Sequence, residues 1–155
     1  MTTEESKDLI HRVFSLAGSG DLSEFETLLD DNFTYRSTVG EEVHGRDAMI
    51  DFVTMFNEAF SNFRVEPQDL VAEGDTVYFT YRQTGTHTGE YWGIAPSNEE
   101  MDILITARVK VRNGKLVEQF DNYNALELLR QLNAFPEASR RDVDKISRQI
   151  PRTRA

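Results

Sequence analysis

The chain has 155 residues, a length that suits one domain able to bury a core of its own. It has no cysteine, which excludes a disulfide framework, a thiolate nucleophile and a metal site built on cysteine. Its formal net charge is −10, and a chain this acidic repels phosphate backbones, which argues against a nucleic-acid partner.

The sequence carries no sign of a targeting or membrane segment. The first ten residues lack the basic start and the apolar run of a secretory signal peptide. No apolar run approaches the roughly 20 residues that a membrane-spanning helix needs. We therefore expect a cytoplasmic protein that has no membrane partner.

Helical periodicity dominates the first part of the chain. Residues 2–17 predict an amphipathic helix, with Thr2 and Glu5 spaced to form a capping box. A second short helix is expected from Asp21. The clearest helix is expected over 45–60, where apolar residues recur at helical spacing.

The remaining segments are typical of antiparallel strands joined by hairpins. Strands are expected after a turn at 30–32, over 33–37, 64–73, 76–84, 101–111 and 116–123. Gly74 and the Asn113 and Gly114 pair mark hairpin turns, and Pro67 favours an edge position. A closing helix is expected over 125–132.

This order of elements predicts an α+β fold. A curved antiparallel sheet wraps around the N-terminal helices, as a cone-shaped α+β barrel formed by residues 1–135. Residues 136–155 form a polar tail in which six Arg or Lys outnumber three Asp or Glu. Because such a cone stays open at one end, polar groups inside it are functional candidates.

Asp121 is the first of these candidates. It lies near the end of the last expected strand, between the aromatic residues Phe120 and Tyr123. Desolvation by such neighbours raises the pKa of a carboxyl group and suits it to acid/base work. A strand-end carboxylate can also face solvent or cap the closing helix, and the spacing alone does not decide between these interpretations.

A second candidate region is the run GTHTGEYWGIAPSNEE, residues 85–100. Its His87 can donate and accept a proton near neutral pH, although a sheet histidine bonded to its neighbours is the alternative. Trp92 stands beside a Gly/Pro bend, where a ring can roof a pocket, although such rings more often fill a core. The three histidines form no recognisable ligand pattern, so we expect no metal site.

These segments together resemble the SnoaL-like polyketide cyclases of the ketosteroid-isomerase-like superfamily. That family typically shows a G-T-H-x-G segment that runs on to a Gly and a Pro, then a strand with D-G-K-(I)-V-E-x-W-D, then a closing L-L-x-Q-L helix. The matching residues are Gly85, Thr86, His87, Gly89, Gly93, Pro96, Gly114, Lys115, Val117, Glu118, Phe120, Asp121, Leu128, Leu129, Gln131 and Leu132. The resemblance spans about residues 5–135.

The resemblance implies a homodimer paired through the sheet. It also implies ring closure by an intramolecular aldol reaction on an aromatic polyketide, without a metal or an organic cofactor. Asp121 matches the aspartate that acts as general acid/base. A mostly apolar cavity would hold a small apolar or aromatic ligand, and we expect it to be lined by Trp92, Tyr91, Tyr35, Phe120 and Tyr123.

One departure from the family pattern bears on the chemistry. Relatives often carry an Asp or His opposite the base on the preceding strand, and a count back from Gly114 puts Ala107 there. Catalysis would then depend on His87, or the reaction would differ. Two other classes stay open, a module that binds a small ligand without chemistry and a dimerisation domain whose cavity is filled by its own side chains. The Asp-Arg-Asp arrangement of an epoxide hydrolase cannot be assembled from these strands.

Overall fold

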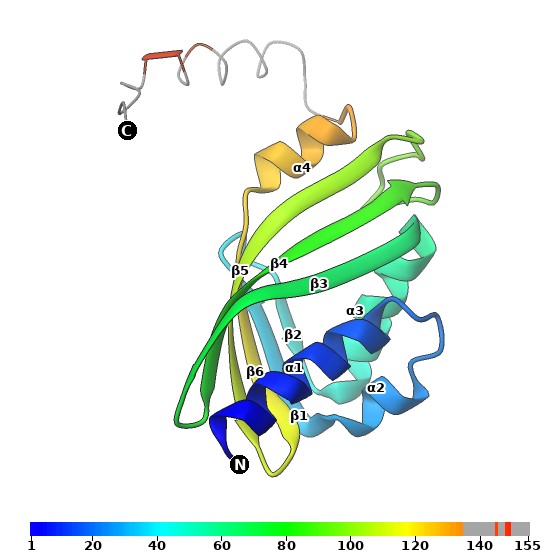
Figure 1. Ribbon diagram of the computed structural model, residues 1–155. Helices are drawn as coiled ribbons and strands as arrows, with labels where there is room; N and C mark the ends of the chain where they lie inside the picture. Colours follow the sequence, from blue (N-terminus) through cyan, green and yellow to red (C-terminus); the bar gives the residue numbers. More distant parts are fainter. Residues whose placement is uncertain (135–144, 146–147, 150–155) are drawn as a thin grey trace.

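The computed structural model of the chain describes residues 1–134, 145, 148 and 149 (Figure 1). Its elements in chain order are α1 (Thr3–Ala17), α2 (Ser23–Thr27), β1 (Leu29–Ser37), β2 (Glu42–His44), α3 (Arg46–Ala59), β3 (Phe60–Glu73), β4 (Thr76–His87), β5 (Glu100–Arg112), β6 (Lys115–Asn122) and α4 (Ala125–Gln131). The polar tail expected over 136–155 lies, apart from three residues, outside the described part of the chain.

The strands form one curved sheet in the order β2-β1-β6-β5-β4-β3. β3 to β6 pair antiparallel through hairpin connections, whereas β1 pairs parallel with β6. The expectation of a wholly antiparallel sheet was wrong for this one pair. A hairpin forces its two strands to run antiparallel, but β1 and β6 are linked through α3 and four other strands, so no hairpin sets their direction. The α+β class and the curved sheet around N-terminal helices are confirmed, and the sheet ends at β2 and β3 without closing.

Two helices cover the concave face of the sheet. α1 lies against β3, and α3 contacts both β1 and β3 (Figure 1). Each helix turns an apolar stripe inward, as its sequence predicts. The buried residues are Leu9, Ile10, Val13, Phe14 and Ala17 of α1, and Met49, Val53, Phe56 and Ala59 of α3. The space between these stripes and the sheet is where the cavity described below lies.

Local signals in the sequence explain several element boundaries. The Thr2 hydroxyl accepts from the Glu5 backbone N–H at 3.1 Å, and the Glu5 carboxylate accepts from the Thr2 N–H at 2.8 Å, which confirms the capping box. Asn113 and Gly114 both have positive φ, as the hairpin turn requires. Pro67 lies on β3, an edge strand, as expected.

The secondary structure differs from the sequence prediction at two places in the N-terminal half, in β1 and in β2. The expected turn at 30–32 belongs to β1, where the pairing register with β6 shifts between Leu29 and Thr34. The Asp30 carboxylate accepts from the Asn32 N–H at 2.9 Å, so the polar residues that suggested a turn form a local irregularity within the strand. The short strand β2 has no hydrophobic alternation, and it was not predicted.

The Gly-rich run after β4 packs directly on the end of α3. The N–H groups of Thr88 and Gly89 both donate to the carbonyl of Ala59, at 3.1 and 2.9 Å. A Cβ on Gly89 would stand 2.3 Å from the carbonyl oxygen of Glu58. Only glycine permits this approach, which explains why the motif has a glycine at this position.

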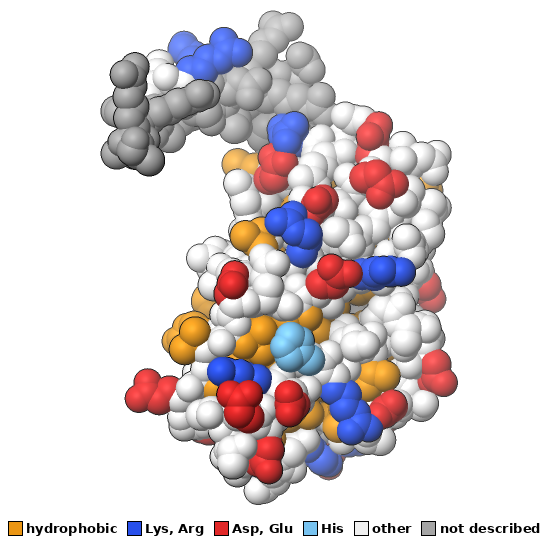
Figure 2. All heavy atoms as spheres, viewed as in Figure 1, with side chains coloured by type: hydrophobic (Ala, Val, Ile, Leu, Met, Phe, Trp, Pro, Cys, Tyr) orange, Lys and Arg blue, Asp and Glu red, His pale blue; other side chains and the backbone are white. Residues whose placement is uncertain are grey.

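The outer surface carries charges of both signs. On the face seen in Figure 2, Asp and Glu side chains are interspersed with Lys and Arg, and hydrophobic side chains show between them. Within the described residues, no helix is long and apolar enough to cross a membrane. The cytoplasmic location expected from the sequence stays a prediction.

Candidate active site

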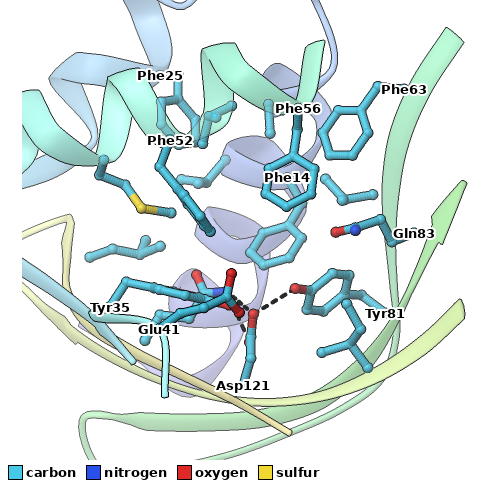
Figure 3. A pocket seen from close by; sticks show the side chains of 18 of the residues that line it. Phe14, Phe25, Tyr35, Glu41, Phe52, Phe56, Phe63, Tyr81, Gln83 and Asp121 are labelled. Carbon is cyan, nitrogen blue, oxygen red and sulfur yellow. Dashed lines mark hydrogen bonds between the residues drawn. The ribbon is translucent and has the colours of Figure 1, made fainter. Parts of the chain in front are cut away.

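A cavity lies between the two helices and the concave face of the sheet (Figure 3). Its free internal volume is about 70 Å³. The walls are mostly aliphatic and aromatic, with Phe14, Phe52, Phe56 and Phe63 among the rings. The polar side chains among the lining residues are Tyr35, Glu41, Tyr81, Gln83, Tyr91, Gln119, Asp121 and Tyr123. Two of these are carboxylates, and no Lys, Arg or His is among them.

Asp121 lies on the floor of this cavity and is only 1% exposed. Its side chain points inward because it shares the buried face of β6 with Gln119, two residues before it. The Tyr81 hydroxyl donates to its Oδ2 at 2.7 Å (Figure 3). The Gln119 amide donates to its two oxygens at 3.1 and 3.2 Å. The carboxylate is therefore buried but not without partners.

Burial sets the protonation behaviour of this carboxylate. Desolvation raises the pKa of Asp121 from 3.8 to about 6, and the negative charge of Glu41 adds to the increase. Hydrogen bonds from Tyr81, Gln119 and Tyr35 act in the opposite direction and limit the rise of this pKa. A group with a pKa of about 6 can both take up and release a proton near neutral pH, which is what a general acid/base needs.

Glu41 supplies a second carboxylate at the same cavity, and the sequence analysis missed it. It follows the end of β1 and accepts from the Ser37 hydroxyl at 2.9 Å and from the Tyr123 hydroxyl at 2.5 Å. Burial together with this hydrogen bond raises the pKa of Tyr123 above its usual range. Burial likewise raises the pKa of the Tyr35 hydroxyl, so both tyrosines stay neutral hydrogen-bond donors at this end of the cavity.

Ala107 does lie opposite Asp121, in the register of β5 with β6. The polar partner that relatives often carry on β5 is thus missing from that strand. Tyr81 on β4 supplies a polar partner instead. β4 pairs with β5 on the side away from β6, and the Tyr81 hydroxyl donates to the Asp121 carboxylate from there. This contact joins two strands that are not adjacent in the sheet, so the sequence could not reveal it.

His87 does not reach the cavity. It is fully buried beyond it, with its ring 5.4 Å from that of Phe60. Its Nδ1 lies 2.9 Å from the Ser97 hydroxyl and accepts from the Ser97 N–H at 3.2 Å, while its Nε2 has no partner among the described residues. Burial lowers the pKa of His87. This geometry matches the alternative given above, a histidine that is bonded to its neighbours. Its contacts with Ser97 hold the loop that leads from β4 to β5.

The other expected lining residues divide into two groups. Tyr35, Tyr91 and Tyr123 line the cavity, whereas Trp92 and Phe120 do not. Trp92 is 65% exposed and borders a mostly apolar depression, which shares Glu41, Tyr91, Tyr123 and Leu128 with the cavity. Phe120 faces the outer side of the sheet, where the Arg108 guanidinium lies 5.4 Å from its ring centre. The physical reason for Phe120 is strand alternation: a neighbour of the inward-facing Asp121 must point outward.

Three inward-facing polar residues on the strands were also missed. These residues, Tyr81, Gln83 and Gln119, were not among the predicted site residues. A signal for them existed, because each falls on the apolar phase of an alternating strand: Gln83 with Val77 and Phe79, and Gln119 with Asp121. A polar residue on the buried phase needs a partner, and here that partner is the cavity or another member of the network.

The raised pKa of Asp121 makes stability depend on pH in a defined direction. Between about pH 4 and pH 6 the folded state keeps a proton that the unfolded state has lost, so the free energy of unfolding falls as the pH rises through this window, by about 3 kcal/mol. Asp121→Asn cannot ionise and escapes this loss. We expect the difference in unfolding free energy, variant minus wild type, to grow by about that amount from pH 4 to pH 7 in urea titrations.

Tyr81→Phe provides the matched comparison for this pH dependence. It removes a hydrogen bond that lowers the pKa of Asp121 in the folded state. The fall in unfolding free energy should therefore continue to a higher pH than in the wild type. A difference between wild type and Asp121→Asn that stays constant from pH 4 to pH 7 would contradict a raised pKa.

Comparison with known proteins places the fold in a family. The family model described as SnoaL-like polyketide cyclase matches residues 7–132. AclR from Streptomyces galilaeus, a hydroxylase candidate, is 24% identical over 95% of this chain and 94% of its own, with a TM-score of 0.76. A SnoaL-like polyketide cyclase candidate from Jannaschia sp. CCS1 is 21% identical over 86% of this chain and 95% of its own, with a TM-score of 0.75.

A third solved structure is IdmH from Streptomyces antibioticus, a polyketide cyclase candidate. It is 24% identical over 83% of this chain and 98% of its own, with a TM-score of 0.71. No curated protein matches the chain significantly. Likeness at these identities shows the fold, while the match of the family model over most of the chain shows the family. The chain belongs to the SnoaL-like polyketide cyclases.

Proposed function

We propose that the protein catalyses cofactor-free acid/base chemistry on a small, mostly apolar carbonyl compound, of the cyclase or isomerase type. The observation that carries this proposal is Asp121, a carboxylate with a pKa of about 6 on the floor of a largely aromatic cavity. Family membership adds to it, although the fold alone does not fix a reaction, as the differing descriptions of its relatives illustrate.

In the proposed reaction, the ionised Asp121 removes a proton from the carbon next to the substrate carbonyl. The electron pair of that C–H bond moves into an enolate, whose oxygen needs a hydrogen-bond donor. The neutral hydroxyls of Tyr81 and Tyr35 are donors that interact with Asp121 in the network. Once Asp121 is protonated it accepts hydrogen bonds more weakly, so these hydroxyls become free to turn toward the enolate.

Ring closure then completes the cycle without any other reagent. The enolate carbon attacks a second carbonyl of the same molecule, one carbon–carbon bond forms, and the charge passes to the new alkoxide oxygen. Asp121 returns its proton to that oxygen and is ionised again. If the substrate has no second carbonyl within reach but has a double bond conjugated with the enolate, return of the proton to a different carbon of that system gives an isomerase instead. In both cases the Tyr81 hydroxyl polarises the substrate carbonyl.

A second candidate function is a binding module without chemistry. Ala107 favours it, because the acid or histidine that relatives often carry opposite the base is missing. The third class, a dimerisation domain with a filled cavity, has less support because a core that only fills space gains nothing from burying the Asp121 carboxylate. Loss of turnover without loss of ligand affinity on Asp121→Asn separates the first two functions.

Hydrogen exchange at carbon tests the proton abstraction directly. With 2-tetralone in deuterium oxide, we expect the wild type to catalyse exchange of the protons beside the carbonyl, and Asp121→Asn to reduce the rate at least about 100-fold. The wild-type rate should fall below about pH 6, since the base must be ionised. The control is Asp102→Asn. It removes an exposed carboxylate that pairs with Arg82 on the outer face, and it should keep full activity. Undiminished exchange in Asp121→Asn would refute the role.

We further propose that the protein is a homodimer that pairs through the outer face of the sheet. Tyr78 on β4 and Leu104 on β5 are about half exposed there, beside Phe120 and Arg108. Sedimentation at micromolar concentration should give twice the chain mass of 17.8 kDa. Leu104→Glu should yield monomers, whereas Leu126→Glu, which charges an exposed side chain of α4, should not. A monomeric wild type would exclude this interface.

A further inference from the structure

Gln83 is a buried polar group of the cavity that the proposed reaction does not use. It lies on β4 and is 6% exposed. Strand alternation turns it inward on the same face as Tyr81, two residues before it. In Figure 3 its amide group extends into the cavity, on the side of Phe56 and Phe63.

The amide of Gln83 is poorly satisfied by the protein itself. Its Nε2 has one contact, the Met101 thioether sulfur at 3.6 Å, and sulfur is a weak acceptor. Its Oε1 has no hydrogen-bond partner among the described residues. Buried amides are nearly always bonded, because leaving one unpaired opposes folding. An unpaired amide that points into a cavity is therefore explained best by a partner that enters the cavity.

The position of Gln83 fixes where this partner must lie. Successive inward-facing residues of a strand are about 7 Å apart, so the Gln83 backbone is one such step from Tyr81. Tyr81 in turn donates to Asp121 at 2.7 Å. Around Gln83 the lining is apolar, formed by Phe56, Phe63, Val65 and Ile105 among others. The cavity thus has one polar end at Asp121 and a separate polar point at Gln83, with aromatic rings between them.

We propose that Gln83 is a specificity-determining residue, which binds a second oxygen of the substrate at a point separate from the carbonyl that reacts at Asp121. This inference rests on the proposed function and deepens it. A carboxamide can donate and accept, so it suits a neutral hydroxyl or carbonyl group. The lining residues include no cation to pair with an anionic group. The substrate is then a neutral ketone that carries a second oxygen away from the reacting carbonyl.

A pair of ligands that differ by one hydroxyl tests this assignment. The probes are 2-tetralone and 6-hydroxy-2-tetralone, whose added hydroxyl lies at the end opposite the ketone. Binding is measured by calorimetry at pH 7. We expect the wild type to bind the hydroxylated ketone about tenfold more tightly, as one good hydrogen bond to a buried group allows. In Gln83→Leu this preference should vanish, while the affinity for 2-tetralone stays within about twofold.

Two further variants keep the result clear. Gln83→Met preserves the shape of the side chain without its amide, and it replaces the leucine variant if that one fails to fold. Gln68→Leu removes an exposed glutamine from the neighbouring strand β3 and should keep the full preference. Equal binding of both ketones by the wild type, binding of neither, or a preference that survives loss of the amide would overturn the assignment.

The same experiment separates this inference from the proposed reaction. Binding needs no turnover, so the preference can be measured on Asp121→Asn as well. A preference for the hydroxyl that depends on Gln83, in a protein that catalyses no exchange, would retain the binding assignment and reject the acid/base role. Exchange that depends on Asp121, without any preference for the hydroxylated ketone, would support the acid/base role and reject the binding assignment.

Discussion

The burial of one carboxylate beneath a layer of aromatic rings is the constraint on which the rest of this structure depends. A desolvated Asp121 opposes folding unless donors reach it, and the Tyr81 hydroxyl and the Gln119 amide do so. These donors leave its pKa near 6 rather than returning it to 3.8. The cavity above it exists because α1 and α3 bridge the curve of the sheet without filling it. A polar group is thus kept in an apolar space, at a cost in stability that a purely structural domain would have no reason to retain.

The alternation of strands decides which residues take part. Gln119 and Asp121 on β6, and Tyr81 and Gln83 on β4, all point into the cavity because each pair is two residues apart. Phe120, between two of them, faces the other side and lies under Arg108. One sheet therefore presents two surfaces with different chemistry, a cavity with two carboxylates inside and a mixed apolar and charged face outside. We propose the first as the site of a small ligand and the second as the face that pairs with a second copy of the chain.

Much of the fold was readable from the sequence, because the signals were local. The capping box at Thr2, the turn at Asn113 and Gly114, and the helical stripe of α3 each predicted its element. The parallel pairing of β1 with β6 was not readable, since it joins segments that no turn connects. For the site, Asp121 was found from its motif, whereas Tyr81 was not, because its role arises from a contact 40 residues away in sequence. His87 was misjudged for the opposite reason: its motif is real, but its partners are Ser97 and the chain around it.

The most direct test of the central claim is to titrate the Asp121 carboxyl carbon by NMR in protein labelled with ¹³C at aspartate, with Asp121→Asn identifying the signal. We expect the signal to titrate with a midpoint near pH 6, and at higher pH in Tyr81→Phe, where a stabilising donor is gone. A midpoint near pH 4, the value of an ordinary solvated aspartate, would contradict it. The carboxylate would then be no better suited to acid/base work than any other acid on the surface, and the cavity would have to be explained by binding alone.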